Sequence, residues 1–114
     1  MKFIGNMLAA FAACALLMPV TATAVDAEAA EALARQENCL KCHGIDKRKS
    51  APSYTQIAKK YAGKADAEER LLKHLQSARF VMVNDEEEQH RVPKTKDEAA
   101  LRNLIQWILS LNNQ

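Results

Sequence analysis

Hydrophobic residues recur at helical spacing over most of the chain, and the spacing is clearest near the C-terminus. The apolar face of this predicted C-terminal helix consists of Leu101, Leu104, Ile105, Ile108 and Leu111. Thr95 and Glu98 have the spacing of a capping box, which predicts that the helix begins at Thr95. Trp107 belongs to the same helix. A helix with one apolar face buries that face against other elements, so this segment is expected to contribute much of the core.

Three further helices are predicted upstream, over residues 26–38, 54–61 and 66–78. The first is rich in alanine, and Asp26 can cap its first turn. The second is followed by Gly63, a residue that commonly ends helices. The third starts at Asp66 and has Glu69 three positions later, which is a second capping-box pattern.

The segments between these helices are short and lack regular spacing. Residues 44–52 are basic and polar between Gly44 and Pro52, which predicts a loop. Residues 80–83 form a short apolar run that fits either helix or strand, and residues 84–93 are expected to be an irregular loop. No strand pattern persists along the chain, and 114 residues suffice for one small domain. The expected fold class is therefore all-α.

The N-terminal segment has the features of a cleaved secretory signal. Lys2 precedes an apolar run over residues 3–18, Pro19 breaks that run, and residues 22–24 form a small-x-small cleavage site. A membrane-spanning helix needs about 20 apolar residues, so the run is short for an anchor. We expect residues 1–24 to be removed and residues 25–114 to fold in the periplasm without stable membrane insertion.

The net charge narrows the set of partners. Sixteen basic residues against 14 acidic ones give a formal net charge of +2, which argues against nucleic acid as a partner. The charge is unevenly distributed, since a basic cluster early in the chain contrasts with an acidic run over residues 85–88. The members of the basic cluster are Lys41, Lys47, Arg48 and Lys49. A solvated face is the simplest interpretation of the acidic run.

The chemistry is concentrated in the Cys-x-x-Cys-His motif at residues 39–43. This spacing is typical of c-type haem attachment. Cys39 and Cys42 can each add to a haem vinyl group, and His43 then projects toward the iron as an axial ligand. One covalent haem c is the predicted cofactor.

Three other uses of the same cysteines are weighed against haem attachment. A redox-active dithiol usually lies in a βαβ context, and none is visible here. A structural zinc site normally takes four protein ligands, and no second ligand pair has the right spacing. A plain disulfide remains the third alternative, but it gives no role to the adjacent histidine.

Several segments resemble the small bacterial class I cytochromes c. They are the haem motif, residues 49–54, residues 57–61 and residues 104–111. The resemblance implies about four short helices around one haem, with the N- and C-terminal helices packed together. It also implies that the backbone carbonyl of Pro52 accepts a hydrogen bond from His43, which would orient that ligand.

The sequence departs from this family where the sixth iron ligand is expected. Class I members usually supply methionine from a Met-Pro segment before the last helix, but here that segment contains His90 and no methionine. His90 is the favoured sixth ligand. Met82 is the alternative, although a methionine in an apolar run is most often a core residue. His74, in the middle of a predicted helix, is the weakest candidate.

The resemblance implies a periplasmic electron carrier rather than an enzyme, with redox proteins as donor and acceptor. A His90 ligand would favour a low potential, because imidazole donates more strongly to ferric iron than methionine does. The basic cluster would then steer an acidic partner toward the haem edge. Two alternatives stay open: a haem subunit of a periplasmic oxidoreductase, and a small-ligand-binding haem protein with an open sixth position.

Overall fold

The computed structural model describes residues 13–18 and 24–113. The elements in chain order are helices α1 (Ala27–Gln36), the 3₁₀ helix η1 (Cys39–Lys41), α2 (Tyr54–Tyr61), α3 (Ala67–Gln76), strands β1 (Phe80–Val83) and β2 (Glu86–Gln89), α4 (Glu98–Ser110) and the 3₁₀ helix η2 (Leu111–Asn113). Four α-helices with one small two-stranded sheet make the domain mostly helical, as the hydrophobic pattern predicts.

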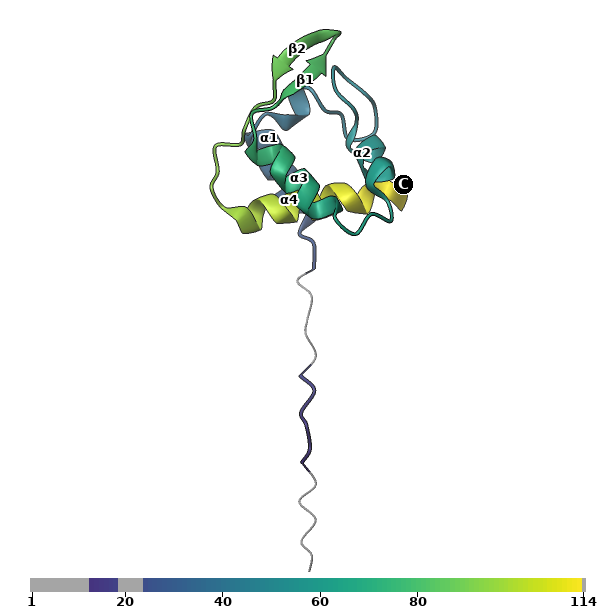
Figure 1. Ribbon diagram of the computed structural model, residues 1–114, viewed down its shortest axis with the longest axis vertical. Coiled ribbons are helices and arrows are strands. Elements are labelled where there is room, and N and C mark those ends of the chain that lie inside the picture. The colour runs from purple at the N-terminus through teal and green to yellow at the C-terminus, as the bar shows by residue number, and fades with distance from the viewer. Residues whose placement is uncertain (1–12, 19–23, 114) are drawn as a thin grey trace, which may run out of the picture.

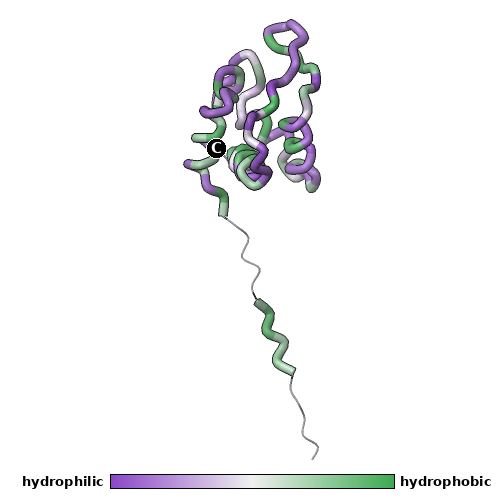
Figure 2. The backbone as a smooth tube through the Cα atoms, turned by 90° about the vertical axis from the view of Figure 1, so that its left-hand side faces the viewer, coloured by the Kyte–Doolittle hydropathy of each residue, from purple (hydrophilic) through white to green (hydrophobic). Residues whose placement is uncertain are grey.

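Much of the predicted signal segment, residues 1–24, lies outside the described residues. The described part of it, residues 13–18 and residue 24, is exposed and hydrophobic throughout (Figure 2). Within the described ranges, no helix combines the length and apolar character needed to cross a membrane.

The N- and C-terminal helices pack together at the base of the domain (Figure 1). Ala30 and Ala34 of α1 are fully buried, and their small side chains allow the backbone of α1 to approach α4 closely. Asn103 of α4 reinforces this contact at the start of α1: it accepts a hydrogen bond from the backbone N–H of Asp26 (2.9 Å) and donates one to the carbonyl of Asp26 (2.8 Å). The predicted pairing of the two terminal helices is confirmed.

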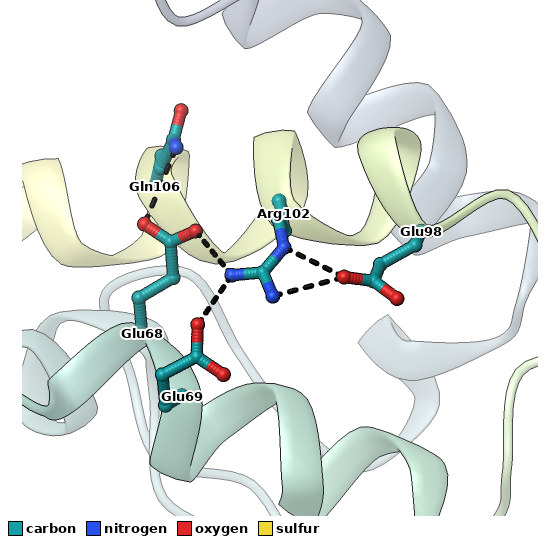
Figure 3. A network of polar contacts seen from close by, with 5 residues as sticks. All are labelled: Glu68, Glu69, Glu98, Arg102 and Gln106. Carbon is teal, nitrogen blue, oxygen red and sulfur yellow. Dashed lines mark hydrogen bonds and ion pairs between the residues drawn. The ribbon is translucent and has the colours of Figure 1, made fainter.

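Helix α3 is attached to α4 by an apolar cluster and a polar network. Leu71 and Leu72 of α3 pack with Leu101 and Ile105 of α4. Beside them, the guanidinium of Arg102 bonds to three carboxylates from the two helices (Figure 3). Isolated surface ion pairs contribute little to stability, but a network from both helices fixes their relative orientation. Helix α3 is therefore a firm support for the side chains it carries toward the centre of the fold.

The two capping boxes predicted at Asp66 and at Thr95 are wrong, although the helices that they were expected to begin are present. The carboxylate of Asp66 makes no capping hydrogen bond and instead pairs with Arg70 at 3.0 Å. Helix α4 is capped by Asp97, which accepts a hydrogen bond from the N–H of Ala100 (3.2 Å). Ion pairs compete for the same carboxylates, since Glu69 and Glu98 both bind Arg102. The sequence spacing of a capping box therefore does not decide which hydrogen-bond donor a glutamate binds.

One predicted cap is confirmed, and one further cap was not predicted from the sequence. Asp26 caps α1 as expected, with its carboxylate accepting a hydrogen bond from the N–H of Ala29 at 3.0 Å. At the start of α2, Ser53 and Gln56 form a complete capping box.

The expectation of an irregular loop over residues 84–93 is also wrong. Strands β1 and β2 form an antiparallel hairpin in which Phe80 pairs with Gln89 and Val83 pairs with Glu86. Asn84 and Asp85 make the two-residue turn with φ of 50° and 65°, the backbone conformation that two-residue hairpin turns need. Strand β2 contains three glutamates and a glutamine, all exposed. Its sequence therefore has no alternation of apolar and polar residues from which a strand could be predicted. The backbone pairing, rather than side-chain pattern, defines this strand.

Candidate functional site

The Cys-x-x-Cys-His motif is folded into a single tight turn after α1. Asn38 adopts a left-handed conformation (φ 61°), which turns the chain out of α1 and into η1. The carbonyl of Cys39 then accepts hydrogen bonds from the N–H groups of Cys42 (3.3 Å) and His43 (3.0 Å). As a result, both thiols and the imidazole face one cavity.

His43 is oriented by two neighbours. Its Nδ1–H donates to the carbonyl oxygen of Pro52 at 2.6 Å, the contact that the family resemblance implies. A carbonyl only accepts, so Nδ1 carries the proton and Nε2 keeps a free lone pair for a metal. The ring also stacks on buried Tyr54, with centroids 5.5 Å apart. Tyr54 in turn makes an edge contact with Trp107, which links the ligand to the core.

The loop after His43 is held against the motif by its own backbone. The N–H of Ala51 bonds to the carbonyl of Cys42 (3.0 Å), and the N–H of Tyr54 bonds to the carbonyl of Gly44 (2.8 Å). A Cβ at Gly44 would lie 1.8 Å from the carbonyl oxygen of Lys47, so only glycine permits this close approach. The loop thereby brings Pro52 to His43.

A cavity of about 780 Å³ lies between the motif and the hairpin. Its walls come from the haem-motif turn, the loop after His43, helices α2, α3 and α4, and both strands. This volume is within the range of about 300–1,000 Å³ that is usual for ligand and cofactor pockets. The lining is mostly apolar, and its charged members are mainly basic: Arg48, Lys60, Arg79 and Arg91 against Glu37 and Glu88.

His90 lies across the cavity from His43. Its ring centroid is 6.4 Å from that of His43, with 56° between the two ring planes. The backbone N–H of His90 bonds to the carbonyl of Arg79 (2.8 Å), which extends the hairpin by one bond and holds the residue at its base. Among the described residues, Nδ1 of His90 has no hydrogen-bond partner although it is buried. Burial lowers the pKa of His90, which leaves the ring neutral near pH 7.

His74 is closer to this group than its position in the sequence suggests. Its ring centroid is 4.2 Å from that of His90, so the two imidazoles are in contact. Burial, followed by the nearby charges of His90 and Arg79, lowers the pKa of His74 to about 4. His74 therefore lines the same cavity as His43 and His90, as a neutral ring in contact with His90.

Met82 also lines the cavity, but it is exposed and is not the core residue that its apolar run suggested. It lies on β1 opposite Glu87, and it is 61 % exposed. Phe80, two residues earlier, is similarly exposed. The structure thus assigns neither side chain to the packed core, and both lie on the hairpin wall of the cavity.

The environment of Cys39 is unlike that of a reactive dithiol. Burial raises the pKa of the Cys39 thiol, whereas redox-active cysteines have a lowered pKa. Cys39 and Cys42 are both free rather than joined in a disulfide. Among the described residues, no group of three or more candidate side chains is arranged to hold a metal ion alone. These observations disfavour the three alternatives to haem attachment.

The residues around the cavity fit a haem c. Cys39 and Cys42 would hold it through thioethers, and His43 would bind its iron through Nε2. The apolar lining is suited to packing against the macrocycle. The basic side chains of the cavity could pair with its propionates; they are Arg48, Lys60, Arg79 and Arg91. Within residues 13–18 and 24–113, no hydrogen bond occupies Nδ1 of His90.

Comparisons with known proteins agree with this site. Residues 27–112 match the cytochrome c family. The chain is 33 % identical to cytochrome c-552 of Hydrogenobacter thermophilus over 96 residues, covering 84 % of this chain and 95 % of that protein. It is 38 % identical to cytochrome c2 of Rhodocyclus tenuis over 84 residues, covering 70 % and 89 %. The crystal structure of the class 1 cytochrome MtoD from Sideroxydans lithotrophicus ES-1 is similar, with a TM-score of 0.73, 50 % identity, and coverage of 77 % of this chain and 98 % of that one.

The fold and the motif together define a small monohaem class I c-type cytochrome with one covalently bound haem c. The chain belongs to the cytochrome c family. The chemistry that this class performs is electron transfer by the haem, and its members matched here are cytochromes rather than enzymes.

Two residues of the site were not predicted from the sequence, and the importance of a third was underestimated. The stacking of Tyr54 on His43 was not predicted, although Tyr54 lies two residues after Pro52. Glu37, two residues before Cys39, also lines the cavity. His74 was considered the weakest candidate, yet it contacts His90. The spacing of His74 from Leu71, one helical turn away, was the available signal that it faces inward.

Proposed function

We propose that this cytochrome is a periplasmic one-electron carrier with bis-histidine iron ligation by His43 and His90. The observation that carries the proposal is the separation of 6.4 Å between the two ring centroids. Imidazole nitrogens bind first-row metals at about 2 Å, so two axial imidazoles on one metal have centroids roughly 6 Å apart. The cavity between the rings leaves room for one macrocycle.

The haem would supply the redox change, with its iron alternating between the ferric and ferrous states. The protein residues keep the ligand geometry fixed during that change. Pro52 and Tyr54 hold His43, the hairpin base holds His90, and His74 limits the rotation of the His90 ring. Two imidazole ligands favour the ferric state more than a histidine–methionine pair does, so the potential is expected to be low for this class.

The absorption spectrum of the ferric holoprotein tests the ligand assignment. Low-spin bands without the weak far-red band of an iron–methionine bond are expected. That far-red band would instead identify Met82 as the ligand. A high-spin spectrum would mean an open site, and binding of a small ligand would replace electron transfer as the best function.

A periplasmic location is supported by the export signal that the sequence predicts over residues 1–24. Cleavage after Ala24 gives a chain that begins at Val25. The intact mass of the same preparation checks this, because it should equal that of residues 25–114 plus one haem. A mass that includes residues 1–24 would contradict the assignment.

The basic cluster is proposed as the partner surface. All four of its members are exposed, but only Arg48 also lines the cavity. The ammonium of Lys49 donates to the carbonyl of Leu40 at 2.7 Å, so Lys49 also supports the motif turn. Lys41 and Lys47 are thus the members available for steering an acidic redox partner.

Charge reversal at Lys41 and Lys47 should slow oxidation of the ferrous protein by ferricyanide. We expect a decrease of roughly tenfold at low salt, shrinking as salt is added, because the effect is electrostatic steering. A cationic oxidant, cobalt tris(phenanthroline), should react faster with the same variant. The matched control is Lys73→Glu, an exposed lysine of α3. Equal effects of the control and of the double variant would show that only net charge matters and that the basic cluster is not a docking surface.

A further inference from the structure

Glu37 connects two segments that are far apart in the sequence and meet at the cavity. It follows α1 directly and lies two residues before Cys39. One carboxylate oxygen accepts a hydrogen bond from the backbone N–H of Lys94 at 2.7 Å. The other accepts one from the backbone N–H of Thr95 at 3.2 Å. A single side chain thus holds the chain between His90 and α4.

The segment that bears His90 has few other attachments. At its hairpin end, the N–H of His90 bonds to the carbonyl of Arg79. Arg91 and Val92, which follow, are both exposed. The next firm attachment along the chain is the pair of bonds to Glu37. Without these bonds, residues 91–95 would be tied down mainly by buried Pro93.

The two hydrogen bonds to Glu37 are stronger than ordinary neutral hydrogen bonds. Each joins a backbone donor to an ionised carboxylate, and such charge-assisted bonds are shorter and stronger than neutral ones. Glu37 is half-buried, so water competes only partly for its oxygens. Losing one carboxylate therefore frees two donors in the loop at once.

We propose that Glu37 is a positioning residue that keeps the His90 segment closed over the iron. The inference rests on the proposed ligation by His90 and adds the element that restrains it. Glu37 does not touch the metal; it acts through the backbone at Lys94 and Thr95. Glu37 lies two residues before Cys39, so its two hydrogen bonds hold the sixth-ligand segment at a fixed distance from the haem attachment turn. The alternative is that Glu37 only stabilises the fold as a whole.

Cyanide binding to the ferric holoprotein distinguishes a positioning role from a purely structural one. Cyanide must displace His90, so its rate reports how often the segment opens. Replacing Glu37→Ala removes both hydrogen bonds to a charged group and should raise the rate of cyanide binding roughly tenfold or more. Glu37→Gln keeps one acceptor oxygen and should give an intermediate rate. The resting spectrum of both variants should stay low-spin.

Asn103→Ala is the matched control for global stability. It also removes two side-chain-to-backbone hydrogen bonds, those with Asp26, but at the α1–α4 contact. Glu31→Ala controls for charge, since Glu31 lies on α1, the helix that Glu37 follows, and pairs only with Arg35 among the described residues. Both controls should bind cyanide at the wild-type rate.

Each outcome decides the proposal. A faster rate in Glu37→Ala with wild-type rates in both controls supports positioning. Equal acceleration by Asn103→Ala would overturn it in favour of a structural role. A wild-type rate in Glu37→Ala would also overturn it, while a low-spin wild-type spectrum would leave the ligation by His90 intact. A high-spin wild-type spectrum would overturn both.

Discussion

Replacing His90 with alanine is expected to convert the ferric protein from low-spin to high-spin and to open its iron to external ligands. The reason is geometric: the His90 ring is the imidazole that faces His43 at 6.4 Å. Alanine supplies no donor atom, so water or an added anion takes the vacated position. Absorption spectroscopy with and without cyanide measures the change. An unaltered low-spin spectrum in His90→Ala would refute the assignment.

Two companion variants sharpen this test. His74→Ala removes the ring that contacts His90 at 4.2 Å but should leave the protein low-spin. If His74→Ala becomes high-spin while His90→Ala does not, the two histidines exchange roles. His90→Met should remain low-spin and raise the reduction potential by on the order of 0.1 V, because axial ligands set haem potentials over a wide range. Cyclic voltammetry measures that shift.

Preventing haem attachment is expected to abolish the stable fold. The cavity of about 780 Å³ is large for a domain of this size. Without a haem, the apolar side chains that line the cavity would face water, and burying such side chains contributes about 1.5–3 kcal/mol each. Many domains are stable by only about 5–15 kcal/mol, so the loss of a few such contacts is enough to unfold this one.

The variant that tests this carries both Cys39→Ala and Cys42→Ala. Its far-UV circular dichroism should show little helix, and its urea titration should lack a cooperative transition. Lys41→Ala is the control, since Lys41 lies between the two cysteines, is exposed and is not needed for haem attachment; it should fold like the wild type. Native helix content with a cooperative transition in the double variant would show that packing of α1, α3 and α4 suffices without the cofactor.

Most of the helical architecture could be predicted from local patterns. The residues of α2 match the predicted range, and the other three helices differ from their predicted ranges by a few residues at their ends. Apolar periodicity succeeds here because each helix buries one face, and that face is visible in a short window of sequence. The two incorrect capping boxes fail because their glutamates bind Arg102 instead. Glu69 is 33 residues away from it in the sequence, whereas Glu98 is four residues away on the same helix.

The hairpin shows where local patterns carry no signal. Strand β2 is entirely polar and exposed, so neither alternation nor propensity marks it. It exists because the two positive-φ residues of the turn bring its backbone into register with β1. Only the three-dimensional structure shows that this hairpin forms a wall of the cavity.

The sequence by itself determined the cofactor and predicted the residues that attach it. The spacing of Cys39, Cys42 and His43 is a local covalent requirement, satisfied within a single turn. The sixth position is different, because its geometry depends on residues that are distant along the chain. His43, His74 and His90 converge only when α3 and the hairpin pack around the cavity. The restraint by Glu37 spans 57 residues, so tertiary structure alone decides it.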